Sequence, residues 1–162
     1  MTHICEKQAE AVLTACRQKG LLLTTVESCT GGLIAASLTN IAGSSDILDC
    51  GFVVYSNESK TRLVGVSAEL IKTHGAVSKE VAIAMAEGGL KYSLAAISIA
   101  VTGIAGPGGA CSEKPIGLVH FAIARKNHET VHKEMRFDKM NRHSIRHATV
   151  ENALQLTLAS LK

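Results

Sequence analysis

Apolar residues along the chain recur at two spacings, and the two alternate in a regular order. Spacings of three and four residues predict helices at residues 5–19, 30–40, 67–75 and 79–91, and a final helix after residue 141. Short apolar and β-branched runs predict strands at residues 21–26, 50–55, 96–102 and 116–125, and residues 130–137 are predicted as a further strand beyond the turn at residues 126–129. Ser67, Ser78 and Asn141 stand where helix caps are expected, because their side chains can accept a backbone N–H.

The order of these elements predicts the fold class. Helices alternate with strands through the first two-thirds of the chain, which predicts an α/β sandwich with a largely parallel sheet. The last two strands are separated only by the turn at residues 126–129, so they should pair as a hairpin and make the sheet mixed. Ligands usually bind at the carboxyl ends of parallel strands, so the loops after these strands are the first places to expect a site.

Composition narrows the classes of protein that this chain can be. The 162 residues are 46% hydrophobic and 19% charged with only 2 prolines, which predicts one packed domain over residues 1–162 and excludes a disordered chain. The 17 basic and 14 acidic residues leave a net charge of +3, and no run of Lys or Arg accompanies it. We therefore expect no binding of nucleic acid or of a membrane surface, although a local pocket for an anionic small molecule is compatible with this charge.

Cysteine and histidine provide no pattern for a metal site or a disulfide framework. The 5 cysteines include no C-x-x-C pair, and the 7 histidines form no H-x-H arrangement. Residues 128–132 match H-E-x-x-H, but they lie across a predicted turn and strand and not on the helix that a zinc site of this kind needs, so we predict no metal ion. Residues 1–10 lack the apolar core of a signal peptide, and the longest apolar run, residues 94–101, is far shorter than the ~20 residues of a membrane span. We expect a soluble cytoplasmic protein with reduced thiols.

The segment at residues 27–32, Glu-Ser-Cys-Thr-Gly-Gly, carries the first candidate chemistry. It places Ser28 at the carboxyl end of a predicted strand, beside the N-terminus of the following helix, where free N–H groups and the helix dipole stabilise an anion. Such a position suits a nucleophilic serine with its own oxyanion donors. Taken alone, however, the residues of this segment favour a cluster of capping side chains before an ordinary helix.

Three further residues are candidates for the same chemistry. Cys29 is a rival nucleophile, because the same helix dipole would lower the pKa of its thiol, although an inert buried cysteine is the commoner case. Lys60 could remove the Ser28 proton if burial keeps its amine neutral, whereas most lysines are solvated. Tyr55 could relay a proton or pack on a substrate ring, or it could be an aromatic residue of the core.

Two other segments could bind a ligand. Residues 103–109 follow a buried strand and are rich in glycine, so their backbone could lie against a ligand, but their spacing does not match the dinucleotide fingerprint G-x-G-x-x-G. A simple long turn is the alternative for this segment. Arg142 and Arg146 are four residues apart at the start of the last helix, so they share a face and could clamp a phosphate or carboxylate. A solvated helix face is the alternative for this pair.

Taken together, these segments resemble the CinA carboxy-terminal domain family over residues 5–160. The ordered set of matching segments, which is far more specific than any one motif, comprises residues 27–32, 41–45, 51–58 with Lys60, 74–78, 103–107 and 114–117. The resemblance implies a three-layer α/β/α sandwich with a mixed, mostly parallel sheet, often dimeric, and no metal or other cofactor. It also implies hydrolysis of the carboxamide of nicotinamide mononucleotide, which yields nicotinic acid mononucleotide and ammonia.

The resemblance further implies roles for individual residues. Ser28 matches the nucleophile and Lys60 the general base, with Tyr55 nearby, and the N–H groups of residues 29–31 would hold the oxyanion. The implied substrate-binding positions are Cys29, Thr30, Gly31, Gly32, Ser44, Asn57, Thr102, Gly103, Gly106 and Arg142. Two other classes stay open: a nucleotide-binding regulatory module without catalysis, and a partner-binding protein in DNA uptake or damage response.

Overall fold

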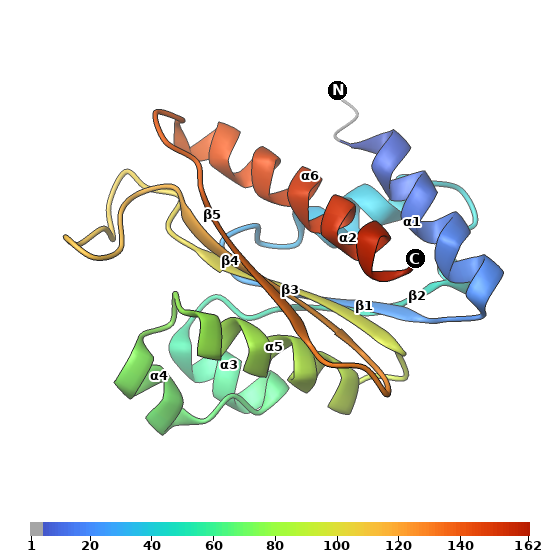
Figure 1. Ribbon diagram of the computed structural model, residues 1–162, viewed down its shortest axis with the longest axis horizontal. Helices are drawn as coiled ribbons and strands as arrows, with labels where there is room; N and C mark the ends of the chain where they lie inside the picture. Colours follow the sequence, from blue (N-terminus) through green and yellow to red (C-terminus); the bar gives the residue numbers. More distant parts are fainter. Residues whose placement is uncertain (1–4) are drawn as a thin grey trace.

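The computed structural model of the chain describes residues 5–162, which form a five-stranded sheet with helices on both faces (Figure 1). Residues 1–4, part of the stretch assessed for a signal peptide, lie outside the described residues. The strands are β1 (Leu23–Glu27), β2 (Leu48–Val53), β3 (Ile97–Gly103), β4 (Leu118–Arg125) and β5 (Val131–Arg136). The helices are α1 (Glu6–Lys19), α2 (Leu33–Thr39), η1 (Ser44–Asp46), α3 (Asn57–Val64), α4 (Ala68–His74), α5 (Lys79–Lys91) and α6 (Arg142–Ser160).

The sheet has the strand order β2-β1-β3-β4-β5. β1 pairs in parallel with β2 and β3, whereas the β3–β4 and β4–β5 pairs are antiparallel, so β4 runs against the other four strands. This arrangement confirms the mixed, mostly parallel sheet and the hairpin of the last two strands. The interior strands β1, β3 and β4 are buried almost throughout, while β2 alternates between half-buried and exposed residues because it lies at an edge.

Helices α1, α2 and α6 cover one face of the sheet, and α3, α4 and α5 cover the other (Figure 1), which confirms the three-layer α/β/α sandwich. Each face has its own cluster of buried aliphatic side chains. On the second face, Gly88 and Gly89 of α5 lie so close to Val64, Val26 and Ser98 that a Cβ at either position would collide with them. The two glycines therefore allow α5 to pack directly on α3 and the sheet.

The chain leaves β1 and β2 toward opposite faces of the sheet. After β1 it enters α2 on one face, and after β2 it enters α3 on the other (Figure 1). In an open α/β sheet, such divergent connections create a crevice outside the carboxyl ends of the neighbouring parallel strands. Ser28 follows β1 and Tyr55 follows β2, so the topology brings these two residues to the same crevice.

Two boundaries at this crevice differ from the prediction. α2 begins at Leu33 rather than at residue 30, because Gly31 and Gly32 have φ values of +60° and +100° and form a turn before the helix. β2 ends at Val53, so Tyr55 lies beyond the strand rather than within it. Both shifts lengthen the loops at the carboxyl ends of β1 and β2.

Helix α3 was not predicted, because its sequence Asn-Glu-Ser-Lys-Thr-Arg-Leu-Val is mostly polar and presents no clear apolar stripe. Its start is nevertheless well defined, since the Ser56 hydroxyl accepts the N–H of Ser59 at 3.0 Å. The three predicted caps are confirmed, with Ser67, Ser78 and Asn141 accepting from Leu70, Val81 and Ser144. Local capping was thus easier to predict than a helix without an apolar face.

Candidate active site

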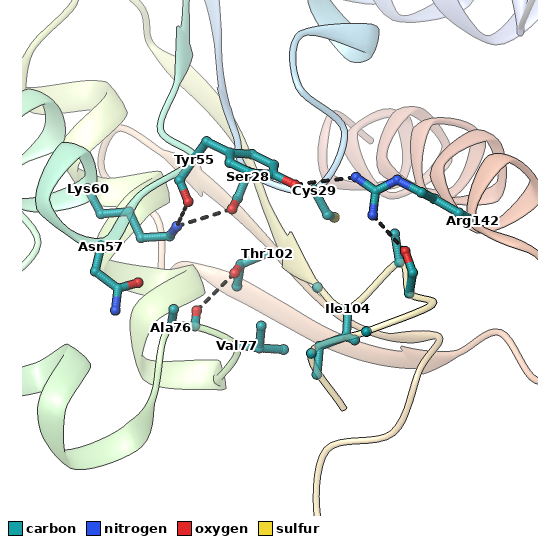
Figure 2. Close-up of a pocket in the computed structure, with 15 residues that line it drawn as sticks. Ser28, Cys29, Tyr55, Asn57, Lys60, Ala76, Val77, Thr102, Ile104 and Arg142 are labelled. Atoms are coloured by element: carbon teal, nitrogen blue, oxygen red, sulfur yellow. Dashed lines mark hydrogen bonds between the residues drawn. The ribbon is translucent and has the colours of Figure 1, made fainter. Parts of the chain in front are cut away.

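A cavity of about 270 Å³ occupies the crevice at the carboxyl ends of β1, β2 and β3 (Figure 2). Its walls come from the turn after β1, the start of α3, the loop before α5, the loop after β3 and the first residue of α6. The lining residues are Ser28, Cys29, Tyr55, Asn57, Lys60, Ala76, Val77, Thr102, Gly103, Ile104, Ala105, Gly106, Gly108, Gly109 and Arg142. Of the residues described, no Asp or Glu lines the cavity, and its two basic side chains are Lys60 and Arg142.

Ser28 and Lys60 form the buried end of the cavity. The N–H of Ser28 donates to the carbonyl of Val101 at 3.1 Å, which continues the pairing of β1 with β3 and holds Ser28 at the end of its strand. Lys60 reaches it from α3, and its Nζ lies 3.1 Å from Ser28 Oγ (Figure 2). Ser28 is 8% exposed and Lys60 is 1% exposed, so the structure brings the two candidate residues together in a site shielded from water.

The surroundings of Lys60 favour its neutral form. Its Nζ donates to the carbonyls of Val54 at 2.9 Å and Tyr55 at 3.3 Å, and no carboxylate in the described part of the chain pairs with it. Burial lowers the pKa of Lys60, although the nearby Cys29 has the opposite influence. A neutral amine has two N–H groups and one lone pair, so the two carbonyls can take both hydrogens and leave the lone pair for the Ser28 hydroxyl. A general base for Ser28 needs this arrangement.

Glu27 anchors the turn after β1, a role that the sequence did not predict. Its fully buried carboxylate accepts from Thr30 Oγ1 at 2.7 Å and from the N–H groups of Gly32, Ile34 and Ala35 at 3.1, 3.0 and 2.9 Å. Because these amides belong to the N-terminus of α2, Glu27 occupies the anion site of that helix. The prediction that this helix N-terminus would stabilise a reacting anion is therefore wrong. An acidic residue at the end of an apolar strand, just before a helix, was the available signal.

Cys29 lines the cavity but is not activated as a nucleophile. It is 6% exposed, and burial, together with the carboxylate of Glu27, raises the pKa of its thiol to about 12. The prediction that the helix dipole would lower this pKa is wrong, because burial dominates and Glu27 already satisfies the helix N-terminus. The structure supports the alternative, a buried and inert cysteine.

Tyr55 and Arg142 form the open end of the cavity. Arg142, the first residue of α6, donates from Nη1 to the carbonyl of Gly106 at 2.7 Å and from Nη2 to the Tyr55 hydroxyl at 3.3 Å. Tyr55 is 62% exposed, so it is not an aromatic residue of the core. Figure 2 shows how Tyr55 spans the site, with its carbonyl bonded to Lys60 and its phenol bonded to Arg142.

Arg146 does not line the cavity, although it lies one helical turn after Arg142. It donates from Nε to the carbonyl of Cys29 and from Nη2 to the carbonyl of Thr30, both at 3.0 Å. The structure does not support the possibility that Arg142 and Arg146 clamp an anion together, since Arg146 is bonded to the backbone of the turn after β1. Among the described residues, Arg142 alone brings a guanidinium to the cavity.

The other predicted substrate-binding residues divide into two groups. Those that line the cavity are Asn57, Thr102, Gly103 and Gly106. Those that the structure places outside its lining are Thr30, Gly31, Gly32 and Ser44. Thr30, Gly31 and Gly32 belong to the turn that Glu27 anchors. Ser44 is a largely buried residue of η1. Ala76 and Val77 line the cavity without having been singled out, and their place in the segment at residues 74–78 was the available signal.

Metal-ligating side chains are scattered in the part of the chain that the structure describes, where no group of three or more His, Cys, Asp or Glu is placed to hold a metal ion. His120 and His132 form a pair on β4 and β5, with Nδ1 of the first 2.9 Å from Nε2 of the second. Between residues 5 and 162, no helix is both long enough and apolar enough to cross a membrane.

Comparison with known proteins places this site in a family. The family model described as CinA C-terminal domain matches residues 5–161. Nicotinamide-nucleotide amidohydrolase PncC from Escherichia coli is 43% identical over 147 residues, which are 91% of this chain and 88% of that protein. A CinA-like protein from Chlorobium luteolum is 56% identical over 117 residues, which are 72% of this chain and 27% of that protein. This chain thus spans less than a third of the length of several curated relatives.

A solved structure shows that the likeness extends to the whole fold. The crystal structure of competence/damage inducible protein CihA from Agrobacterium tumefaciens superimposes on this chain with a TM-score of 0.94 at 48% sequence identity. The superposition covers 99% of this chain and 96% of that one. The architecture of the five-stranded sheet and its flanking helices is therefore shared between the two proteins.

Proposed function

We propose that the chain, which belongs to the CinA C-terminal domain family, is an amidohydrolase that acts on the carboxamide of nicotinamide mononucleotide. The relative from Escherichia coli that is named nicotinamide-nucleotide amidohydrolase supports this substrate, since the similarity covers 88% of it. The observation that carries the proposal is the 3.1 Å contact between Lys60 Nζ and Ser28 Oγ at the buried end of the cavity. It supplies a nucleophile and a base in one shielded place.

In the proposed mechanism, neutral Lys60 accepts the hydroxyl proton of Ser28 as Oγ attacks the carboxamide carbon. Backbone N–H groups of the turn after β1 stabilise the oxyanion that forms. Protonated Lys60 then donates its proton to the departing nitrogen, so that ammonia leaves and an acyl-enzyme on Ser28 remains. Water, deprotonated by Lys60, hydrolyses this ester and releases nicotinic acid mononucleotide.

The charge distribution of the cavity supports a substrate with its phosphate at the open end. Arg142 stands there with guanidinium N–H groups, while the buried end contains the Ser28 and Lys60 pair. A nucleotide oriented in this way would place its carboxamide beside Ser28 and its phosphate beside Arg142. The volume of about 270 Å³ lies just below the usual range for small-ligand sites, roughly 300–1,000 Å³, and favours a mononucleotide over a dinucleotide.

An ammonia-release assay with nicotinamide mononucleotide tests the proposed function directly. We expect stoichiometric ammonia and nicotinic acid mononucleotide from the parent protein and neither product from Ser28→Ala. Isolation of the acid product by chromatography excludes release of nicotinamide through cleavage of the glycosidic bond. A parent protein that binds the nucleotide but releases no ammonia contradicts the proposal.

The name of the relative CihA, a competence/damage inducible protein, favours a second candidate function. In this alternative the chain is a catalytically silent module that binds a nucleotide or a protein partner in competence or damage response. It predicts a rise in melting temperature with nicotinamide mononucleotide but no release of ammonia, so the ammonia measurement separates the two functions.

The cellular setting and the assembly of the proposed enzyme are part of the same proposal. We propose that it works in the cytoplasm as a single domain over residues 1–162, that it forms a dimer, and that it binds neither nucleic acid nor a membrane. Size-exclusion chromatography with light scattering tests the dimer, and salt-dependent binding to a DNA duplex would contradict the expected absence of nucleic-acid partners.

A further inference from the structure

The proposed mechanism leaves Arg146 without a role, although this half-buried cation touches the turn that carries Ser28. It lies on α6, and its two bonds to Cys29 and Thr30 join residues that are 117 and 116 positions apart in the sequence. Its guanidinium also lies against Gly31, where a Cβ would come within 3.5 Å of Nη2. A long-range contact of this kind holds a catalytic turn from outside the cavity.

The backbone bonds of the turn show which amides are free to act on a substrate. The N–H of Ser28 donates to Val101, the N–H of Gly31 donates to the carbonyl of Ser28 at 3.1 Å, and the N–H of Gly32 donates to Glu27. Within residues 5–162, no oxygen accepts the N–H of Cys29 or of Thr30, and the contact of the Cys29 N–H is with the sulfur of its own side chain, which a substrate oxygen could replace. Of these two residues, Cys29 lines the cavity next to Ser28. The amide directly after a nucleophile is a common oxyanion donor.

A short chain of contacts connects Arg146 to this amide. In a trans peptide the C=O and the N–H point in opposite directions. When Arg146 holds the carbonyl of Thr30, the N–H of Gly31 is directed away from α6, where it donates to the carbonyl of Ser28. That bond in turn orients the peptide between Ser28 and Cys29 and therefore the N–H of Cys29.

An arginine is the side chain that fits this task. Its planar fork presents Nε and Nη2 as two parallel donors, and the carbonyls of Cys29 and Thr30 each accept one of them at 3.0 Å. A lysine could replace the charge but not the two fixed donor directions. The hydrogen bonds of Arg146 go to carbonyls of the turn after β1 and not to Lys60, so we expect Arg146 to act on geometry and not on the base.

We propose that Arg146 is a positioning residue: it orients the turn after β1 so that the N–H of Cys29 faces the developing oxyanion on the substrate of Ser28. This inference rests on the proposed function, because it assigns a role within the same reaction. It separates the two arginines of α6, since Arg142 contacts the substrate and Arg146 acts only through the backbone.

Steady-state kinetics with nicotinamide mononucleotide test this role. Arg146→Ala should lower kcat on the order of 10²-fold, the usual effect of losing one oxyanion donor, with KM within about threefold of the parent. Millimolar guanidinium should restore part of kcat in Arg146→Ala, and Arg146→Lys should fall between Arg146→Ala and the parent. The matched control is Arg136→Ala on β5, an exposed arginine paired with Glu134, which should leave kcat unchanged.

A second measurement keeps the inference separate from the identity of the substrate. Diisopropyl fluorophosphate should label Ser28, because Oγ forms a bond to phosphorus, the P–F bond breaks with loss of fluoride, and Lys60 takes the hydroxyl proton. Mass spectrometry should show that Arg146→Ala slows this labelling by a factor similar to the loss of kcat. A parent protein that is labelled but does not release ammonia would refute the proposed function while the labelling rates still decide the role of Arg146.

Three results overturn the inference. The first is a kcat and a labelling rate in Arg146→Ala within about twofold of the parent, which would make the contact merely structural. The second is a rise in KM at unchanged kcat, which would place Arg146 in contact with the substrate. The third is a parent protein that shows neither turnover nor labelling, since Ser28 would then have no oxyanion to stabilise. If Arg146→Ala does not fold, Arg146→Lys provides the same comparison.

Discussion

The two ends of the cavity differ in how completely their polar groups are satisfied. At the buried end, Ser28 and Lys60 are almost without solvent contact, and Lys60 Nζ has three hydrogen-bond partners. At the open end, Tyr55 is 62% exposed, and the phenol is joined to Arg142 by one bond of 3.3 Å. The polar groups of the first end are buried and bonded within the protein, whereas the Tyr55 phenol at the second end is exposed and has one weak bond.

Under the proposed function, this difference suits the buried end to chemistry and the open end to binding. A lysine becomes a useful base only where water is excluded, because burial is what lowers its pKa. A cation that captures a phosphate must instead be reachable from solvent, so it belongs at the mouth. Substitutions at the buried end should therefore change kcat, and substitutions at the open end should change KM.

Ser28→Ala should have the largest effect and lower kcat by about 10⁴-fold or more, because the acyl-enzyme cannot form without the nucleophile. The fold should persist, since the strand pairing of Ser28 uses its backbone. The matched control is Cys29→Ala, which should keep much of the activity because its thiol is buried and has a raised pKa. Activity in Ser28→Ala together with none in Cys29→Ala would reverse the assignment.

Lys60→Met should lower kcat by about 10²–10⁴-fold, the usual contribution of a general base. The acidic limb of the kcat/KM profile should report the Lys60 pKa, lower than the ordinary value of 10.5, and should disappear in the variant. A variant with near-normal kcat would show that Lys60 is not the base.

The same variant should also reveal the cost of burying this lysine. Between its folded pKa and 10.5, Lys60 binds fewer protons in the folded than in the unfolded chain, so the free energy of unfolding should rise with pH across this window. The rise should be about 1.4 kcal/mol per unit of pKa lowering. Urea unfolding at several pH values should show this rise in the parent but not in Lys60→Met, which should be at least as stable at pH 7. A much lower melting temperature for Lys60→Met would indicate a structural role instead.

Arg142→Ala should act at the open end and raise KM about tenfold or more, for the loss of ~1.5–3 kcal/mol from a charged hydrogen bond, with kcat little changed. The substitution also removes the hydrogen bond from Arg142 to the Gly106 carbonyl, which lies in the loop after β3 and not beside Ser28 or Lys60, so kcat should be little affected. Initial-rate kinetics over a range of nucleotide concentration measure both constants. An unchanged KM would remove Arg142 from the phosphate site.

Tyr55→Phe should have a smaller effect, because it removes only the hydroxyl that accepts from Arg142 and keeps both the ring and the carbonyl that contacts Lys60. We expect a two- to threefold rise in KM, about the value of one weak exposed hydrogen bond. A loss of kcat of about 10²-fold or more would instead show that the phenol relays a proton in the reaction.

Dialysis against EDTA should have no effect on kcat. The proposed mechanism draws its nucleophile, base and oxyanion donors from the chain itself, and the cavity lining offers, among the residues described, no carboxylate or imidazole to bind a metal. Metal analysis of the active protein is the accompanying measurement. A stoichiometric metal that is lost together with activity would overturn the prediction.

Elements that depend on neighbouring residues were predictable from the sequence. The caps at Ser67, Ser78 and Asn141 act over three residues, so their motifs are complete in the sequence. The hairpin of β4 and β5 follows from the short turn between two predicted strands, of which only the first is an apolar run. The candidate pair of Ser28 and Lys60 could be named from the segments that resemble a known family, but its 3.1 Å contact could not be derived from spacing alone.

Tertiary structure decided the properties that depend on distant groups. Glu27 could have been an exposed acid, and only the position of α2 shows that its carboxylate anchors that helix. Arg142 and Arg146 are equivalent in the sequence pattern, yet Arg142 faces the cavity, whereas Arg146 is bonded to the turn after β1, which is more than 100 positions earlier in the sequence. The protonation preference of Lys60 has the same origin, because a pKa is set by burial and by neighbouring charges that only the folded chain brings together.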